Sequence, residues 1–440
     1  MGDAVGFWCS RRGLQASSGA VVAVGLALAG LCPGRALAGT LTWGSAQAIG
    51  ALPAGAPAGV SPSLDSLACS SPGACVAVGD FSRTFHTEPS TGFSEPMAVS
   101  ESAGRWGRSL QIMLPSNAAA ATEQQAGLRA VACAPAGACV ALGAYDDHSG
   151  SLQSMIVSQS AGVWSRASEL MLPSAAGGGL VSLTCPVAGS CVAVGSEEDS
   201  FGNSEPIVVS ELDGVWGQPH ALMLPAHVHA AEGDQLTSVS CPRAGACVAV
   251  GDYFLGAADF NPPTSHAMVV SESRGVWRHA RAISLARRLR SAGGQEEQLD
   301  SIACPSAQRC VAVGHYDEDT SGDAHAMLVT ESAGSWGQVT QLSPPAGAES
   351  GQFAGLNAVA CPASSACVAV GQYDTRGQNT LAMAASESGG AWPRAREVAL
   401  PIDGQAGDGL GASLESLACP AVGSCLALGG DQVVSAVRHS

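Results

Sequence analysis

Short apolar segments without strict alternation of apolar and polar residues recur seven times along this chain of 440 residues. In the first copy, Leu64–Cys69 is a run of apolar and small residues, Ser70–Ala74 is rich in turn formers, and Cys75–Gly79 resumes an extended run. A third run, Pro96–Ser100, follows a variable polar loop, and a glycine-containing turn then leads to a tryptophan. The pattern predicts repeating units of four antiparallel strands, each about 57 residues long.

Two series of residues mark the repeat, and they are out of step at the ends of the chain. A C-x5-C pair followed by Val-Ala-Val-Gly or a close variant occurs seven times. A tryptophan that opens each expected fourth strand also recurs seven times, as Trp43, Trp106, Trp164, Trp216, Trp277, Trp336 and Trp392. Strands that are apolar or small on both faces fit blades packed between two neighbours. We therefore expect an all-β, seven-bladed β-propeller with four antiparallel strands per blade, in which the tryptophans are structural residues that cover blade interfaces.

The offset between the two series predicts how the ring closes. The first tryptophan precedes every cysteine pair, and the last pair has no tryptophan after it. Residues 40–50 would therefore supply the fourth strand of the last blade, whose third strand would be Gln432–Val437. An open β-solenoid is the alternative architecture, but it would leave edges that need capping.

The first 38 residues have the features of a secretory signal peptide. Two adjacent arginines precede an uncharged apolar stretch at Gly19–Leu31, and Ala36–Ala38 supplies small residues for cleavage. The apolar stretch is shorter than the roughly 20 residues of a membrane-spanning helix. We expect residues 1–38 to be a signal peptide, residues 39–440 to form the propeller, and the product to be secreted or extracytoplasmic.

The cysteines of residues 39–440 form seven pairs of identical spacing. Paired cysteines in an exported chain indicate disulfides, and a five-residue turn places the flanking cysteines of two strands opposite each other. Buried thiols and a metal site are the alternatives, although no histidine keeps a fixed position beside the pairs, as a zinc site would favour. The expected disulfides, which also mark the seven blade cores, are Cys69–Cys75, Cys133–Cys139, Cys185–Cys191, Cys241–Cys247, Cys304–Cys310, Cys361–Cys367 and Cys419–Cys425.

The repeat core, seen in full at Cys241–Gly251, resembles secreted bacterial repeat proteins whose β-propeller blades carry C-P-x4-C-V-A-V-G. This resemblance covers essentially all of residues 39–440 and implies the propeller fold and a place at the exterior or envelope of a bacterial cell. Members of that group generally lack an assigned activity. The chain is more distantly similar to sialidase-type and photosystem II assembly factor propellers. It lacks the aspartate box of sialidases, S-x-D-x-G-x-x-W, so their catalytic residues are not carried over.

Charge and composition exclude several classes of function. The formal net charge is −17 at pH 7, and such an acidic surface repels phosphate backbones, so we expect no nucleic-acid partner. All 20 basic residues are arginines, which excludes Schiff-base chemistry and P-loop phosphate binding. No G-x-S-x-G or H-E-x-x-H motif is present, and no catalytic residue is predicted. No apolar stretch after residue 38 approaches membrane length, so we expect no membrane span there.

Acidic residues gather in the loops between the second and third strands. Asp317, Asp319 and Asp323, with a glycine at Gly322, are the densest set and could coordinate calcium. A solvated acidic rim is the alternative, because the spacing lacks a closing bidentate glutamate. Otherwise no cofactor is expected. A glutamate that recurs in Ser-Glu-Ser or a variant of it points to a structural role, pairing with an arginine or polar group on the fourth strand: Glu101, Glu211, Glu272, Glu331 and Glu387.

Function is therefore expected in the loops that do not repeat, because binding surfaces usually sit on loops held by a rigid scaffold. The leading hypothesis is an exported, monomeric, non-enzymatic propeller that presents a loop-rich acidic face to a glycan or protein partner. A polysaccharide- or cell-wall-active lyase or hydrolase, with carboxylates in the same loops, is one alternative. A structural envelope component is another.

Overall fold

The computed structural model describes residues 41–57, 60–83, 93–120, 124–172, 178–199, 202–228, 233–255, 264–285, 289, 296–317, 323–349, 352–375, 379–400 and 412–438. The predicted signal peptide, residues 1–38, lies outside these described residues. All strands belong to the unit Ala38–Ser440.

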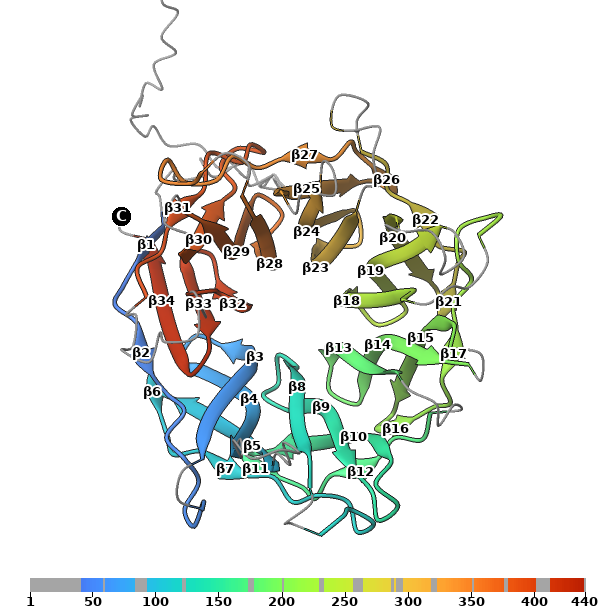
Figure 1. The fold of residues 1–440 in the computed structure, drawn as a ribbon, viewed down its shortest axis with the longest axis vertical. Coiled ribbons are helices and arrows are strands. Elements are labelled where there is room, and N and C mark those ends of the chain that lie inside the picture. The colour runs from blue at the N-terminus through green and yellow to red at the C-terminus, as the bar shows by residue number, and fades with distance from the viewer. Residues whose placement is uncertain are drawn as a thin grey trace, which may run out of the picture. The chain divides into compact units, whose positions relative to one another are not determined.

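Seven antiparallel sheets follow one another around a ring and form a seven-bladed β-propeller, as the sequence predicts (Figure 1). The strands of each blade are lettered A to D from the centre outward. Blade 1 contains β3 (Ser61–Ser71), β4 (Ala74–Arg83), β5 (Phe93–Ser102), β6 (Arg105–Trp106) and β7 (Leu110–Gln111). Blade 2 contains β8 (Ala126–Cys133), β9 (Cys139–Asp146), β10 (Leu152–Ser160), β11 (Val163–Trp164) and β12 (Ser168–Glu169). Blade 3 contains β13 (Gly178–Val187), β14 (Ser190–Glu198), β15 (Ser204–Leu212), β16 (Val215–Trp216) and β17 (His220–Ala221).

The remaining blades repeat this order. Blade 4 contains β18 (Gln235–Arg243), β19 (Ala246–Leu255), β20 (Thr264–Ser273), β21 (Val276–Trp277) and β22 (Arg281–Ala282). Blade 5 contains β23 (Glu297–Ser306), β24 (Arg309–Asp317), β25 (Ala324–Ser332), β26 (Ser335–Trp336) and β27 (Thr340–Gln341). Blade 6 contains β28 (Ala354–Ala363), β29 (Ala366–Asp374), β30 (Thr380–Ser386) and β31 (Arg396–Glu397). Blade 7 contains β32 (Ser416–Ala421), β33 (Ser424–Gly429), β34 (Gln432–Arg438), β1 (Leu41–Trp43) and β2 (Gln47–Ala48).

The ring closes in blade 7, where the two ends of the described chain share one sheet. Strand β1 pairs antiparallel with β34, with Leu41 opposite Arg438 and Trp43 opposite Ala436. Strand β2 pairs with the other end of β34. Strand A of blade 7, β32, also packs against β3 of blade 1. The prediction that the first strand of the chain completes the sheet of the last blade is therefore confirmed.

The fourth strand differs from the expectation of one continuous strand. In blade 1 it consists of β6 and β7, which both pair with β5, and five other blades show the same two pieces. The residue between the pieces turns away from its own sheet to reach the preceding blade. The N–H of Ser109 donates to the carbonyl of Ala51 at 3.3 Å, and the N–H of Ala167 donates to that of Met113 at 2.8 Å. The interruption thus ties the outer edges of neighbouring blades together.

The Val-Ala-Val segment of strand B is apolar on both faces because each face belongs to a different blade interface. Val76 and Val78 pack in the core between blades 1 and 2, whereas Ala77 packs between blades 7 and 1. All three side chains are at most 5% exposed. Each blade therefore contributes two large side chains to the interface with the following blade and a small one to the interface with the preceding blade. The seven tryptophans of the repeat are partly buried and pack against these interface clusters.

A serine on strand A joins most blades to the next. Ser66 Oγ accepts a hydrogen bond from the N–H of Val131 at 3.1 Å. At the ring-closing interface, Ser416 Oγ accepts from the N–H of Leu67 at 3.0 Å. The same bond joins Ser182 to Val239, Ser238 to Ile302 and Ser301 to Val359. Since strand A has no partner strand on its inner side, these hydroxyls satisfy N–H groups that would otherwise be unpaired.

Candidate functional site

The turns and loops of the blades separate into two faces of the ring. The A–B and C–D turns of one blade lie together, as shown by the N–H of Arg274, which donates to the carbonyl of Gly245 at 2.8 Å. The D–A connection instead meets the B–C loop, where the N–H of His148 donates to the carbonyl of Asn117 at 2.9 Å. We call these the hairpin face and the loop face. The acidic B–C loops lie on the loop face.

Two of the acidic loops use their carboxylates to build the loop itself. Asp147 accepts from the N–H and hydroxyl of Ser149 at 2.8 and 2.6 Å and from the N–H of Ser151 at 3.1 Å. These hydrogen bonds, led by that of the Ser149 side chain, lower the pKa of Asp147 to about 2. Asp199 is bonded by the backbone and side-chain amides of Asn203, both at 2.9 Å. These two carboxylates therefore have structural partners.

Buried tyrosines at the ends of B strands brace the loop face. Tyr145 donates to Asn117 Oδ1 at 3.0 Å and lies 3.1 Å from Glu169 Oε2. Tyr373 makes the equivalent bond to Glu397 Oε2 at 3.0 Å. Burial, together with the neighbouring carboxylate, raises the pKa of each tyrosine to about 12. The outer part of this face is thus held by protonated tyrosines.

A β-bulge interrupts strand A at the same point of six blades. In blade 1, Leu64 pairs with Gly79 and Ser66 pairs with Val78, so Asp65 between them has no partner in the register. In blade 7, Glu415 occupies the equivalent position directly before β32. A bulge leaves one residue out of the ladder and redirects its side chain. Because the A strands are innermost (Figure 1), the bulge residues lie along the inner edge of the ring.

The bulge explains the glycine that ends each Val-Ala-Val-Gly segment. A Cβ on Gly79 would lie 2.7 Å from the Cα of Leu64 and closer still to the carbonyl oxygen of Ser63. The equivalent glycines of the other six blades face the same obstruction from strand A. No side chain fits there, so the glycine and the bulge form one structural unit.

The bulge position varies between blades while its neighbours stay nearly constant. It follows a buried leucine and precedes serine or alanine in every blade. The seven residues in ring order are Asp65, Arg129, Val181, Thr237, Asp300, Asn357 and Glu415. None of them is buried. We call this set the inner ring, and it brings six polar or charged side chains to one edge of the molecule.

Two of the neutral members of the inner ring bond to the next blade. Thr237 Oγ1 donates to the carbonyl of Leu299 at 2.5 Å, and Asn357 Nδ2 donates to the carbonyl of Leu414 at 3.1 Å. An ionised carboxylate has no proton for such a bond. Among the described residues, none forms a hydrogen bond with the carboxyl group of Asp65 or Glu415. These two side chains are therefore left for solvent or a ligand.

The first of two acidic groups on the inner edge spans blades 7, 1 and 2. It consists of Glu415, Asp65 and Arg129 of the inner ring with Asp80, which follows the glycine of blade 1. Partial burial among the converging strands, followed by repulsion from Asp80 and Glu415, raises the pKa of Asp65 to about 6. Burial likewise raises the pKa of Asp80 to about 6, and the nearby Arg129 opposes both shifts. This group binds protons more readily than ordinary aspartates do.

The second acidic group lies between blades 4 and 5. Asp252, which is 2% exposed, occupies in blade 4 the position of Asp80 in blade 1, and Gln235 Nε2 donates to it at 3.4 Å. In blade 5 this position is His315, whose Nδ1 lies 3.1 Å from Oδ2 of the inner-ring residue Asp300. Burial, followed by the charges of Asp300 and Asp234, raises the pKa of Asp252 to about 7. The two acidic groups are separated around the ring by blade 3 on one side and blade 6 on the other.

The predicted metal ligands do not form a site in the described part of the chain. Asp317 ends β24 and Asp323 precedes β25, whereas Asp319 lies outside the described residues. Within the described ranges, no three His, Cys, Asp or Glu side chains are grouped so that they could hold a metal ion. Calcium binding at this loop therefore stays a prediction.

The cysteines lie where the hairpin geometry predicts. All seven C-x5-C pairs are joined by disulfides, with Cα–Cα distances from 3.9 to 4.2 Å. Such a set of disulfides is typical of an oxidising, extracytoplasmic compartment. Among the described residues, no helix has the length and hydropathy needed to cross a membrane.

The recurrent glutamates end the C strands on the hairpin face, but their partners are not on strand D as expected. Glu387 accepts from Arg309 Nη2 of strand B in the preceding blade at 2.5 Å. Glu331 accepts from the N–H of Gly334 in its own C–D turn. Glu211 and Glu272 accept backbone hydrogen bonds at Cys191 and Cys247, and burial raises the pKa of both carboxyls. These glutamates therefore tie turns and neighbouring blades together.

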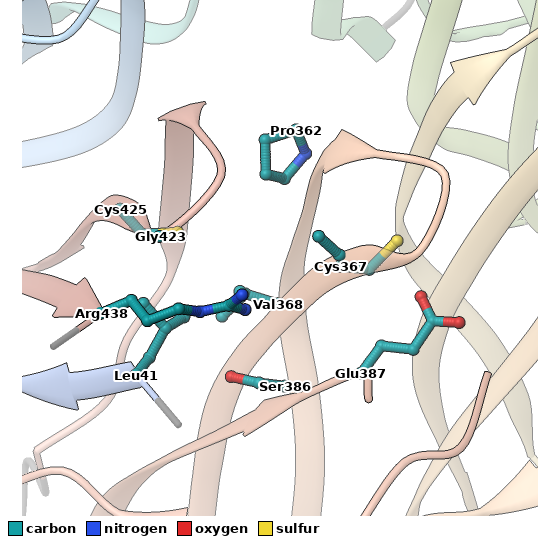
Figure 2. A pocket seen from close by; sticks show the side chains of 10 residues that line it. Leu41, Pro362, Cys367, Val368, Ser386, Glu387, Gly423, Cys425 and Arg438 are labelled. Atoms are coloured by element: carbon teal, nitrogen blue, oxygen red, sulfur yellow. The ribbon is translucent and has the colours of Figure 1, made fainter. Parts of the chain in front are cut away.

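A cavity lies on the hairpin face between blades 6 and 7, beside the C strand of blade 7 (Figure 2). This C strand lacks the polar side chain, glutamate or glutamine, that ends the C strands of the other blades. Blade 7 carries Ala436 where five blades have glutamate and blade 2 has Gln159. Ala436 packs with Leu41, Val368 and Cys425, which line the cavity, and Figure 2 shows Arg438 extending into it. Its volume is about 10 Å³, enough for a single water molecule. The cavity is too small for a ligand.

Comparison with known proteins identifies no family for the chain. No family model matches the chain, and no curated protein matches it. Among solved structures, it is similar to YCF48 bound to D1 peptide, with 10% identity, a TM-score of 0.43, and coverage of 89% of this chain and 100% of that one. It is also similar to a PL25 ulvan lyase bound to a glucuronate–rhamnose 3-sulfate unit, with 8% identity, a TM-score of 0.45, and coverage of 91% and 96%. A Hadza microbial sialidase shares 11% identity with a TM-score of 0.43 over 77% of this chain and 66% of its own.

The inner ring was not predicted, because it lies on strand A and function was expected in the loops that do not repeat. Its signal is nevertheless present in the sequence. When the repeats are aligned on the glycine of Val-Ala-Val-Gly, one position of strand A takes six identities in seven blades, between a fixed leucine and a serine or alanine. A variable position between two nearly constant neighbours indicates a residue that does not build the scaffold.

Proposed function

We propose that the protein is an exported binding module that holds a partner at the inner edge of its loop face, with the inner ring as the recognition surface. The observation that carries this proposal is the inner ring itself. The residues on either side of each bulge are nearly constant and build the blades, whereas the bulge residues vary and lie along one edge. Asp65 and Glu415 have no hydrogen-bond partner among the described residues.

The chemistry of the inner edge favours a partner that carries positive charge. The inner ring and its neighbours include Asp65, Asp80 and Glu415 on one side and Asp252 and Asp300 on another. Carboxylates attract cationic groups and steer them during association, and this attraction weakens with salt. A protein partner with an exposed basic segment fits this surface, and a neutral glycan fits it less well.

A pull-down from the secreted proteins of the producing cell, run beside a glycan array at pH 8 in low salt, tests the proposal. Asp65 and Asp80 are ionised at this pH, because it lies above their raised pKa values of about 6. We expect wild-type protein to capture a basic protein, and D65N to weaken that binding at least several-fold. The control is D213N, which removes one carboxylate from an exposed C–D turn of the hairpin face and leaves binding unchanged. An equal loss of binding in both variants, or binding that does not weaken as the salt concentration rises, would contradict the proposal.

A second candidate function, a polysaccharide lyase or hydrolase, is supported by the pKa values of Asp65 and Asp80. Carboxyl groups that titrate near 6 are suited to general acid–base catalysis close to neutral pH. Turnover assays on acidic and neutral polysaccharides separate the two functions. Product formation that D80N abolishes while the protein stays folded would replace the binding module with an enzyme.

A further inference from the structure

The interface between blades 4 and 5 differs from the other six in the residues that follow the Val-Ala-Val-Gly glycines. In ring order from blade 1, these residues are Asp80, Ala144, Ser196, Asp252, His315, Gln372 and Gly430. Only blades 4 and 5 are neighbours that both carry a titratable group at this position. Asp300, the inner-ring residue of blade 5, lies between them in the same interface.

We propose that this interface is a proton-operated latch, in which Asp252 holds a proton while the blades are closed and releases it when the inner end of the interface opens. The inference concerns the scaffold and does not depend on which partner the protein binds.

The surroundings of Asp252 favour its protonated form. Its side chain is buried at 2% exposure, and its one hydrogen bond from a described residue is the 3.4 Å bond from Gln235. Two further carboxylates, Asp234 and Asp300, face it, and His315 is the cation that opposes them. A buried carboxylate with two like charges nearby is costly when ionised, whereas a protonated one is neutral and donates a hydrogen bond.

His315 holds one of the carboxylates that face Asp252 in place. Its Nδ1 lies 3.1 Å from Asp300 Oδ2, and its ring packs against Phe353 of blade 6 at a centroid distance of 5.5 Å. At the edge of this cluster, Glu297 is buried and lies 3.9 Å from His266.

The pH dependence follows from Asp252. Its pKa is higher in the closed interface than in an open, hydrated one, so closing takes up a proton. The stabilisation by Asp252 is complete below its ordinary pKa of 3.8 and is lost as the pH rises to about 7. Acidification therefore closes the interface, and alkaline pH loosens it.

Amide hydrogen exchange of the intact chain between pH 5 and pH 8 tests the latch. The quantity compared is the protection factor, which is corrected for the intrinsic pH dependence of exchange. The test segments are Gln235–Leu255 of blade 4 and Glu297–Asp317 of blade 5. The internal reference is Ala126–Asp146 of blade 2, where Ala144 occupies the position of Asp252. Linkage to one proton changes the opening constant by up to about tenfold per pH unit. We expect opening at the blade 4–5 interface to rise at least tenfold relative to blade 2 over this range.

The variants H315Q and D252N/H315Q form a matched pair that differs only at Asp252. H315Q is expected to keep the rise in the opening constant, and the double variant is expected to leave it flat within about threefold. Gln372 occupies the same position as His315 in blade 6, so an amide fits the site. Wild-type protection that is as insensitive to pH as that of blade 2, an H315Q variant that loses the dependence, or a double variant that keeps it would each overturn the proposal.

Discussion

Arg309→Ala is expected to destabilise the whole ring, because it removes the charged partner of a buried glutamate. Arg309 Nη2 lies 2.5 Å from Glu387 Oε1 across the interface between blades 5 and 6, and the two side chains are 22% and 1% exposed. Removing one member of a buried ion pair typically costs about 3 to 5 kcal/mol, and the partial exposure of the arginine places this pair near the lower end, at about 3 kcal/mol. For a chain of this size, that loss corresponds to a decrease in melting temperature of about 4 °C.

The repeat supplies matched controls for this experiment. Alanine occupies the position of Arg309 in blades 1, 2, 4 and 6, and glutamine replaces the glutamate in blade 2 at Gln159. The double variant R309A/E387Q recreates residue types that the chain already uses, and it should recover most of the lost stability because no charge stays buried. Thermal and denaturant unfolding measure both variants. A cost below about 0.5 kcal/mol for R309A, or a double variant no more stable than R309A, would refute the reasoning.

Three further predictions concern the scaffold. Gly371→Ala should destabilise the fold by more than about 3 kcal/mol in denaturant unfolding, because the added Cβ would overlap the bulge of strand A. In the control Gly217→Ala, the atom nearest to the added Cβ lies at 3.4 Å, so the cost should be under about 1 kcal/mol. Similar losses of stability in the two variants would contradict this account of the glycine. Ser416→Ala should cost about 1 kcal/mol by the same measurement, because the N–H of Leu67 loses its acceptor, and no measurable change would show that the hydroxyl is not needed. Deleting residues 40–50 should lower the melting temperature of the entire ring, since blade 7 loses β1 and β2, and an unchanged melting temperature would contradict closure through this blade.

The architecture was predictable because its signals are repeated. Val-Ala-Val-Gly has no apolar–polar alternation, which indicates a strand packed on both faces, and the displacement of Trp43 from the cysteine pairs predicts the closing blade. Seven copies of each signal make chance coincidence negligible. The split of the fourth strand was not predictable, because it depends on Ser109 reaching the carbonyl of Ala51 in a different blade.

The partners of polar residues were harder to predict than the strands. The repetition of Glu387 and its equivalents indicated a structural role, but its arginine comes from strand B of the preceding blade, which no local pattern specifies. Likewise, Asp252 reads in the sequence as part of an acidic loop, whereas it is 2% exposed inside a blade interface. Burial of a charged side chain depends on how neighbouring blades pack, and a single repeat does not contain that information.

The central claim is that constant positions build the ring while the inner ring recognises a partner. Hydrogen exchange with and without the captured partner tests this claim most directly. The account predicts protection of the inner strand segments 61–67, 126–131, 297–302 and 412–418, and little change in the A–B and C–D turns of the hairpin face. Protection confined to those turns or to the outer D strands, with the inner segments unchanged, would contradict it.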